Sequence, residues 1–137
     1  MVNFKIILVG ICVISIVSCQ LMINFSPEEM RNLLQYNNQC QRSSGATQQE
    51  IISALQNRFS DSPALKSHIF CLGKKMGFVS DNGTFQRETI RNRMGKYLKD
   101  QSKMDQLMDK CFTGNGNPKE STYNAIKCIS GNRSMVI

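Results

Sequence analysis

The sequence predicts an all-α domain, and two features of its apolar pattern indicate this. Apolar residues recur at helical spacing along most of the chain. No stretch sustains the apolar–polar alternation of a strand, so we expect no β-strands. The length of 137 residues fits one domain, and a composition of 41% apolar and 20% charged residues is too apolar for a disordered chain. We therefore expect one compact bundle of about six helices.

The first 19 residues have the pattern of a secretory signal peptide. Lys5 precedes an apolar run of 12 residues, 6–17, and the small residues Ser18 and Cys19 follow it. The run is shorter than the roughly 20 residues of a membrane span, although an N-terminal anchor is the alternative. We expect cleavage after Cys19, or one residue earlier. The mature domain would then comprise residues 20–137 and be secreted, soluble and extracellular.

Four short motifs predict where helices begin. Ser26-Pro27-Glu28-Glu29, Thr47-Gln48-Gln49-Glu50 and Asn117-Pro118-Lys119-Glu120 have the form of capping boxes, and Ser62-Pro63 is a further start. A fourth helix is expected from about Thr84 and a fifth around Met104. Gly77 fits the left-handed residue that ends the third helix, and Gly95 weakens the fourth.

The cysteines predict two disulfides once the signal peptide is removed. The four that remain are Cys40, Cys71, Cys111 and Cys128. An even number in a secreted chain indicates disulfides, but four cysteines allow three connectivities and spacing alone does not choose among them. No Cys-x-x-Cys pair is present, and a single histidine excludes a multi-histidine metal site. We expect neither a metal nor a cofactor.

Two segments carry a resemblance to a known family. Residues 71–83, CLGKKMGFVSDNG, resemble the third-cysteine region of insect odorant-binding proteins, and residues 118–128, PKESTYNAIKC, resemble their last helix. Most members have further cysteines at the positions of Ser67 and Lys119, and these two bond to each other. Since both are absent, the chain is similar to the four-cysteine "minus-C" subgroup of this pheromone and general odorant-binding family.

This resemblance implies a fold and a function. It implies six helices around an apolar pocket, with disulfides Cys40–Cys71 and Cys111–Cys128. Members of the family carry small hydrophobic ligands, such as odorants and pheromones, through aqueous fluid. A chemosensory receptor is the implied protein partner, and the chain would be a monomer or a weak homodimer.

The expected ligand site is an apolar pocket. Such a site needs aliphatic, aromatic and methionine side chains with few polar groups, and methionine adapts its shape well. Our candidate ligand-binding residues are Leu55, Phe59, Met76, Phe78, Ile90, Met94, Met108, Tyr123 and Ile126. The simpler alternative for each residue is a place in the ordinary core. The apolar tail, residues 135–137, is interpreted as either a frayed terminus or a lid.

His68 is the residue expected to titrate near neutral pH. We favour a surface position on the third helix over a role as a pH switch. A nucleophilic site would have to use this histidine, and no Gly-x-Ser-x-Gly motif accompanies it. We therefore expect no catalytic residues and no enzymatic activity.

The chain is basic, with a formal net charge of +7, and this raises an alternative function. Seven cations lie close together in the sequence: Arg87, Arg91, Arg93, Lys96, Lys99, Lys103 and Lys110. The alternative is a basic secreted helical protein that acts on anionic membranes, as in venom or defence. A solvated helical face is the simpler interpretation. Few aromatic residues lie among these charges, so we expect no nucleic-acid partner, and we expect no stable membrane insertion.

Three glycosylation sequons begin at Asn24, Asn82 and Asn132. Members of the family usually carry no glycans, so the resemblance implies that all three are unoccupied.

Overall fold

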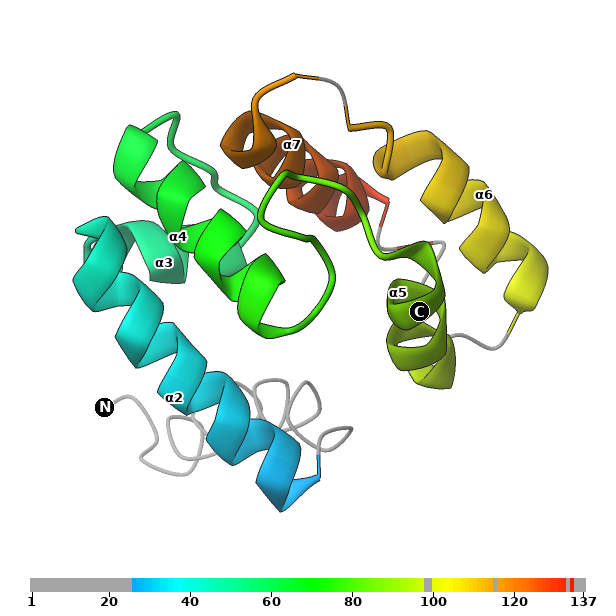
Figure 1. Ribbon diagram of the computed structural model, residues 1–137, viewed down its shortest axis with the longest axis horizontal. Coiled ribbons are helices and arrows are strands. Elements are labelled where there is room, and N and C mark those ends of the chain that lie inside the picture. Colours follow the sequence, from blue (N-terminus) through cyan, green and yellow to red (C-terminus); the bar gives the residue numbers. More distant parts are fainter. Residues whose placement is uncertain (1–25, 98–99, 115, 133, 135–137) are drawn as a thin grey trace, which may run out of the picture. The chain divides into compact units, whose positions relative to one another are not determined.

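The computed structural model describes residues 26–97, 100–114, 116–132 and 134, and the chain divides into two units, Met1–Gln35 and Tyr36–Ile137. The predicted signal peptide and the apolar tail lie outside the described residues. Within them the chain forms helices α2 (Pro27–Ser44), α3 (Gln48–Leu55), α4 (Pro63–Lys75), α5 (Arg87–Met94), the 3-10 turn η1 (Gly95–Tyr97), α6 (Gln101–Cys111) and α7 (Pro118–Gly131) (Figure 1). The all-α prediction is confirmed.

The predicted capping boxes of the first two helices are present. In the first unit, the Glu29 amide donates to Ser26 Oγ at 3.1 Å and the Ser26 amide donates to Glu29 Oε2 at 2.9 Å. In the second unit, Thr47 and Glu50 make the same reciprocal pair at the start of α3. These bonds satisfy amides that the first helical turn leaves without intrahelical acceptors.

The caps of α4 and α7 use one side chain each. Ser62 Oγ accepts from the Leu65 amide at 3.0 Å, and Asn117 Oδ1 accepts from the amides of Lys119 and Glu120 at 2.9 and 3.3 Å. The Glu120 carboxylate forms an ion pair with Lys66 of α4. The predicted third capping box therefore supplies a helix cap at Asn117 and a contact between two helices at Glu120.

The fourth helix is shorter than predicted at its beginning. Residues 84–86 belong to a turn, because the Gln86 amide donates to the Phe78 carbonyl at 2.8 Å and Val79 pairs with Phe85 in an isolated bridge. Helix α5 therefore begins at Arg87. It ends at Met94, and Gly95 starts the 3-10 turn, in line with the weak helix propensity of glycine.

Helix α7 lies at the centre of the second unit, and both α4 and α6 pack against it (Figure 1). A glycine allows the close approach of α4. A Cβ atom on Gly73 would lie 3.0 Å from Val79 Cγ1 and 3.4 Å from Thr122 Cγ2. Any larger side chain at this position would have to push α4 away from its neighbours.

The two disulfides are the predicted ones. Cys40–Cys71 joins α2 to α4, and Cys111–Cys128 joins α6 to α7, with Cα–Cα distances of 5.6 and 5.4 Å. Both distances lie in the usual range for a disulfide. Each bond therefore fixes the end of one helix against a second helix.

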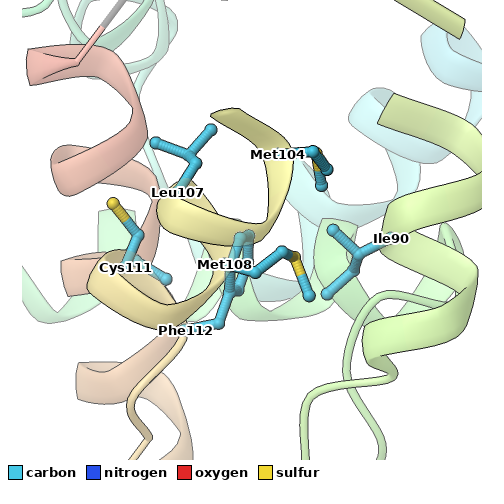
Figure 2. Packing of buried hydrophobic residues seen from close by; sticks show 7 residues of the cluster. Ile90, Met104, Leu107, Met108, Cys111 and Phe112 are labelled. Atoms are coloured by element: carbon cyan, nitrogen blue, oxygen red, sulfur yellow. The ribbon is translucent and has the colours of Figure 1, made fainter. Parts of the chain in front are cut away.

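Two clusters of buried apolar residues form the core of the second unit. The larger one consists of Ile90, Met104, Leu107, Met108, Cys111, Phe112 and Ala125, from α5, α6, the residue after α6, and α7. Figure 2 shows the side chain of Met108 directed toward Ile90, with Leu107 and Cys111 on the other side of α6. The smaller cluster consists of Leu65, Ile69 and Tyr123, from α4 and α7. Helix α7 thus contributes to both clusters.

We expect the close contact at Gly73 to be essential for stability. The G73A variant should lose about 1–2 kcal/mol of unfolding free energy, because the added methyl group overpacks the contact of α4 with Val79 and Thr122. Chemical denaturation followed by circular dichroism measures this. The control is G131A, since Gly131 is also helical but a Cβ there meets nothing within 4 Å. Equal stability of the two variants would contradict the prediction.

Candidate ligand-binding site

Seven of the nine predicted ligand-binding residues belong to the two clusters or pack against them. Ile90, Met108 and Tyr123 are fully buried. The half-buried residues Phe78 and Met94 pack against the larger cluster, and the half-buried Phe59 and Ile126 pack against the smaller one. The predicted residues are therefore divided between two neighbourhoods that share α7.

The other two predicted residues lie outside both clusters. Met76 is the half-buried C-terminal cap of α4, where Gly77 follows with a φ of +76° as predicted. Leu55 is the last residue of α3, and its side chain is 72% exposed. The assignment of all nine residues to a ligand site stays a prediction.

Tyr123 gives the smaller cluster a polar edge. Its hydroxyl donates to the Ser60 carbonyl at 2.8 Å, and the ring of Phe59 meets its ring edge-on at a centroid distance of 6.0 Å. Burial raises the pKa of the Tyr123 hydroxyl, so this group stays protonated and remains a hydrogen-bond donor. An apolar ligand beside this ring would therefore meet a phenol whose polar atom is already satisfied.

Lys66 closes the same edge with two carboxylates. Its ammonium group lies 2.7 Å from Asp61 Oδ1 and 2.8 Å from Glu120 Oε2, and its side chain is only 17% exposed. The hydrogen bonds that Lys66 donates to Asp61 and Glu120 raise the pKa of Lys66. The ammonium also lies 5.2 Å from the centre of the Tyr123 ring. The positive charge of Lys66 is therefore balanced by these two carboxylates.

The sequence contained no local signal that would place Lys66 between two carboxylates. Asp61 lies just before α4, the helix that contains Lys66, whereas Glu120 lies in the first turn of α7. The packing of the two helices is therefore needed to bring the second carboxylate to the lysine.

The surface of the second unit has a hollow of about 470 Å³ beside α5 and α7. Its apolar wall is the edge-on ring pair of Phe85 and Phe112, with centroids 5.1 Å apart, and Arg87 and Ser121 are among its polar residues. None of the nine predicted residues lines it. Its largely polar lining does not suit a hydrophobic ligand.

The prediction of a surface position for His68 is wrong. Its side chain is 2% exposed on the buried face of α4, and its Nε2 lies 3.1 Å from Asn37 Oδ1 of α2. Since the amide oxygen can only accept, this contact is a hydrogen bond in the tautomer that carries its proton on Nε2. Burial lowers the pKa of His68, against a smaller opposing effect of the Cys40 backbone. Leu65 and Ile69 are four residues apart, with His68 between them. This spacing alone was too weak a signal to show that the face with His68 is buried.

The basic residues of α5 are partly neutralised by α6. Arg91 pairs with Asp105 at 2.7 Å, and Arg87 pairs with Asp109. All four side chains are largely exposed, so each pair contributes about 0–1 kcal/mol to stability. The pairing lowers the charge that this face would present to an anionic membrane.

The described helices contain none that is long and apolar enough to cross a membrane. The described residues also contain no group of three or more histidine, cysteine or acidic side chains arranged to hold a metal ion.

The fold and the disulfides define a class of small all-α domains whose helices are cross-linked by disulfides. Comparison with known proteins identifies the family. Residues 23–132 match the PBP/GOBP family. The chain therefore belongs to this family, that of the insect odorant-binding proteins, whose members are binding and carrier proteins.

Individual relatives agree with this assignment. The B2 protein of Tenebrio molitor is 24% identical over 102 residues, which cover 74% of this chain and 80% of the relative. The structure of the THP12 carrier protein from the yellow mealworm is 30% identical, with a TM-score of 0.58 over 69% of this chain and 87% of that one. A fatty acid binding protein from the oral disk of the blowfly Phormia regina is 16% identical, with a TM-score of 0.66 over 80% and 96% of the two chains.

We expect stability to fall as the pH drops through the range where the single histidine titrates. The folded protein holds the pKa of His68 below its ordinary value of 6.5, so the unfolded chain binds the proton more readily. The unfolding free energy should therefore contain the full contribution of the neutral His68 above about pH 6.5 and decline below it. Unfolding free energies measured from pH 7.5 to 5 test this.

The matched variant for that titration is H68Q. A glutamine amide can still donate to Asn37 Oδ1 but does not titrate in this range. The decline just below pH 6.5 should therefore be smaller in H68Q. An identical pH profile in both proteins would show that His68 is not the titrating group.

Ser67 and Lys119, the positions at which the family resemblance implies a third disulfide in most members, should accept one here. Lys66 and Glu120, which are in contact, are the neighbours of Ser67 and Lys119 in the sequence. The double variant S67C/K119C should form a bond that closes a loop of about 50 residues and adds roughly 3–4 kcal/mol of stability. Non-reducing mass mapping and denaturation measure the bond and its effect. Two free thiols after oxidative refolding would contradict it, and S67A/K119A is the control.

Proposed function

We propose that this protein is a secreted carrier that binds small hydrophobic molecules in an internal apolar pocket and transports them through aqueous extracellular fluid. The observation that carries the proposal is the family match over residues 23–132. Odorants, pheromones and other volatile or lipid-like molecules are the proposed ligand class. The name of the blowfly relative, a fatty acid binding protein, supports lipid-like ligands in particular.

Secretion belongs to the same proposal. Residues 1–19 are the proposed signal peptide, and the two disulfides are bonds typical of an oxidising compartment. The partners we propose are the ligand and, in an olfactory setting, a chemosensory receptor. The carrier acts as a monomer or weak homodimer and catalyses no reaction.

The larger cluster is the better place for the pocket. Methionine side chains make up much of its interior, since Met104 and Met108 are fully buried and Met94 packs against them from the end of α5. Methionine changes its rotamer at little cost and is polarisable, so this part of the core can reshape around ligands of different form. We propose that an entering ligand displaces these side chains.

The half-buried residues form the expected route to that interior. Phe78 and Met94 have both buried and exposed surface and lie against the larger cluster. In contrast, the edge of the smaller cluster is closed by Lys66 with its two carboxylates and by the bond from Tyr123 to Ser60. An apolar ligand that opened that edge would separate these polar groups from their partners and leave them unsatisfied, which costs more than moving a methionine.

The expected affinity is moderate. A ligand that buries about 300 Å² of apolar surface gains roughly 7 kcal/mol at 25 cal/mol per Å². Losses of motional freedom reduce this, so dissociation constants on the order of micromolar follow. A carrier that must release its ligand needs binding of this strength.

Displacement of a fluorescent dye tests the proposal. An uncharged naphthylamine dye should bind the oxidised mature protein and be displaced by long-chain alcohols, aldehydes or fatty acids. The protein has no tryptophan whose emission would interfere. No dye binding by the folded protein, combined with salt-sensitive binding to anionic liposomes, would instead support the membrane-active alternative.

Two variants separate the two clusters as ligand sites. M94A should weaken dye binding about tenfold, because Met94 borders the larger cluster, while I126A at the smaller cluster should change it less than threefold. The control is I52A, since Ile52 is an exposed apolar residue of α3. The opposite order of M94A and I126A would move the pocket to the smaller cluster, and equal effects of all three would refute both locations.

A further inference from the structure

The sequon at residues 82–84 forms a hydrogen-bonded turn between α4 and α5. The Gly83 amide donates to the Ser80 carbonyl at 2.9 Å, and the Thr84 amide donates to Asn82 Oδ1 at 3.2 Å and to Ser80 Oγ at 3.1 Å. The Ser80 hydroxyl also donates to Asn82 Oδ1. The oxygen of the Asn82 carboxamide is therefore held by the turn.

The nitrogen of the same carboxamide is free. Within the described part of the chain, Asn82 Nδ2 and the Thr84 hydroxyl have no hydrogen-bond partner, and both residues are exposed. These are the two groups that N-linked glycosylation requires, the amide nitrogen that receives the sugar and the hydroxyl two residues later. The turn holds both of them at the surface with no competing bond.

Gly83 is the residue through which the turn contacts the rest of the fold. It adopts a φ of +87°, and a Cβ there would lie 2.8 Å from Pro118 Cβ at the start of α7. The middle residue of the sequon therefore packs inward, while Asn82 and Thr84 on either side remain exposed. The carboxamide side chain can then be enlarged without disturbing the contact with α7.

There is also room beside this turn. Residues 82–84 form one edge of the surface hollow of about 470 Å³ described above. The first sugar of a glycan would extend from this edge into solvent or over the hollow, where no predicted ligand-binding residue lies.

The sequon at Asn132 offers the opposite environment. Asn132 is half-buried at the end of α7, where its Nδ2 donates to the Cys128 carbonyl at 2.6 Å and its Oδ1 accepts from Lys110 Nζ at 2.9 Å. A sugar on that nitrogen would crowd a short bond beside the Cys111–Cys128 disulfide. The remaining sequon, at Asn24, lies outside the described residues.

We propose that Asn82 is a site of N-linked glycosylation, in contrast to Asn132 and to the unoccupied state that the family resemblance implies. The proposal rests on secretion, which is part of the proposed function. The donor is an oligosaccharide linked to a lipid through a diphosphate. A bond forms between Asn82 Nδ2 and C1 of the first N-acetylglucosamine, the bond from C1 to the diphosphate oxygen breaks with its electron pair staying on the lipid diphosphate, and the amide proton is released.

The experiment uses the full-length chain expressed in insect cells. Protein from the medium is compared before and after peptide-N-glycosidase, which removes the glycan and leaves aspartate at the modified position. Wild type should show one shift in mass and an aspartate at position 82 after digestion. N132Q should keep this shift in full, and N82Q should lose it.

A second substitution tests whether misfolding is the cause of the lost mass shift in N82Q. N82Q moves the accepting oxygen away from the turn by one methylene group, whereas T84A removes a methyl group and a hydroxyl that has no partner within the described residues. T84A should also abolish the shift, with an unchanged circular dichroism spectrum and unchanged dye binding.

The outcomes separate this proposal from the proposed function. Secreted wild type without a shift, or with a shift but no aspartate at position 82 after digestion, overturns glycosylation at Asn82 and leaves the carrier function standing. A chain that never enters the secretory pathway overturns secretion and this site together. Loss of dye binding in a secreted, glycosylated protein refutes only the carrier function.

Discussion

The contact between α4 and α7 is the constraint on which the second unit depends. Gly73 removes the side chain that would hold the helices apart, and buried Thr122 and Val79 fill the space against it. Because α4 is close to α7, Leu65 and Ile69 can bury Tyr123, and Glu120 reaches Lys66. Helix α7 then supplies Ala125 to the larger cluster on its other side. A wider separation at this one contact would disturb both clusters.

The ion pair of Lys66 with Glu120 lies next to Ser67 and Lys119, the two positions at which the family resemblance implies a further disulfide in most members. A disulfide holds two helices at a fixed separation, whereas a lysine between Asp61 and Glu120 holds them through charge-assisted hydrogen bonds that can break and re-form. The cation also lies against the ring of Tyr123, whose hydroxyl is bonded to Ser60. Together these contacts seal the smaller cluster at its polar edge. They resist solvent entry but contribute less stability than a covalent bond.

The sequence predicted local structure better than it predicted the surroundings of single residues. The starts of α2, α3, α4 and α7 follow from caps that act within four residues, and the disulfides follow from the family resemblance. The late start of α5 depends on a bond from Gln86 back to Phe78, which no helix propensity reveals. The burial of His68 and the exposure of Leu55 depend on which helix covers each face, so periodicity alone could not assign them.

The positions of the disulfides explain how the fold can combine a fixed frame with an adaptable interior. Cys40–Cys71 and Cys111–Cys128 each join a helix near its C-terminal end to another helix, and Cys111 is itself a member of the larger cluster. The same cluster contains the flexible side chains of Met104 and Met108. Rearranging a methionine costs little when the backbone around it cannot separate. Cross-links therefore provide the stability that a reshaped core would otherwise lose, and this division fits the carrier function proposed above.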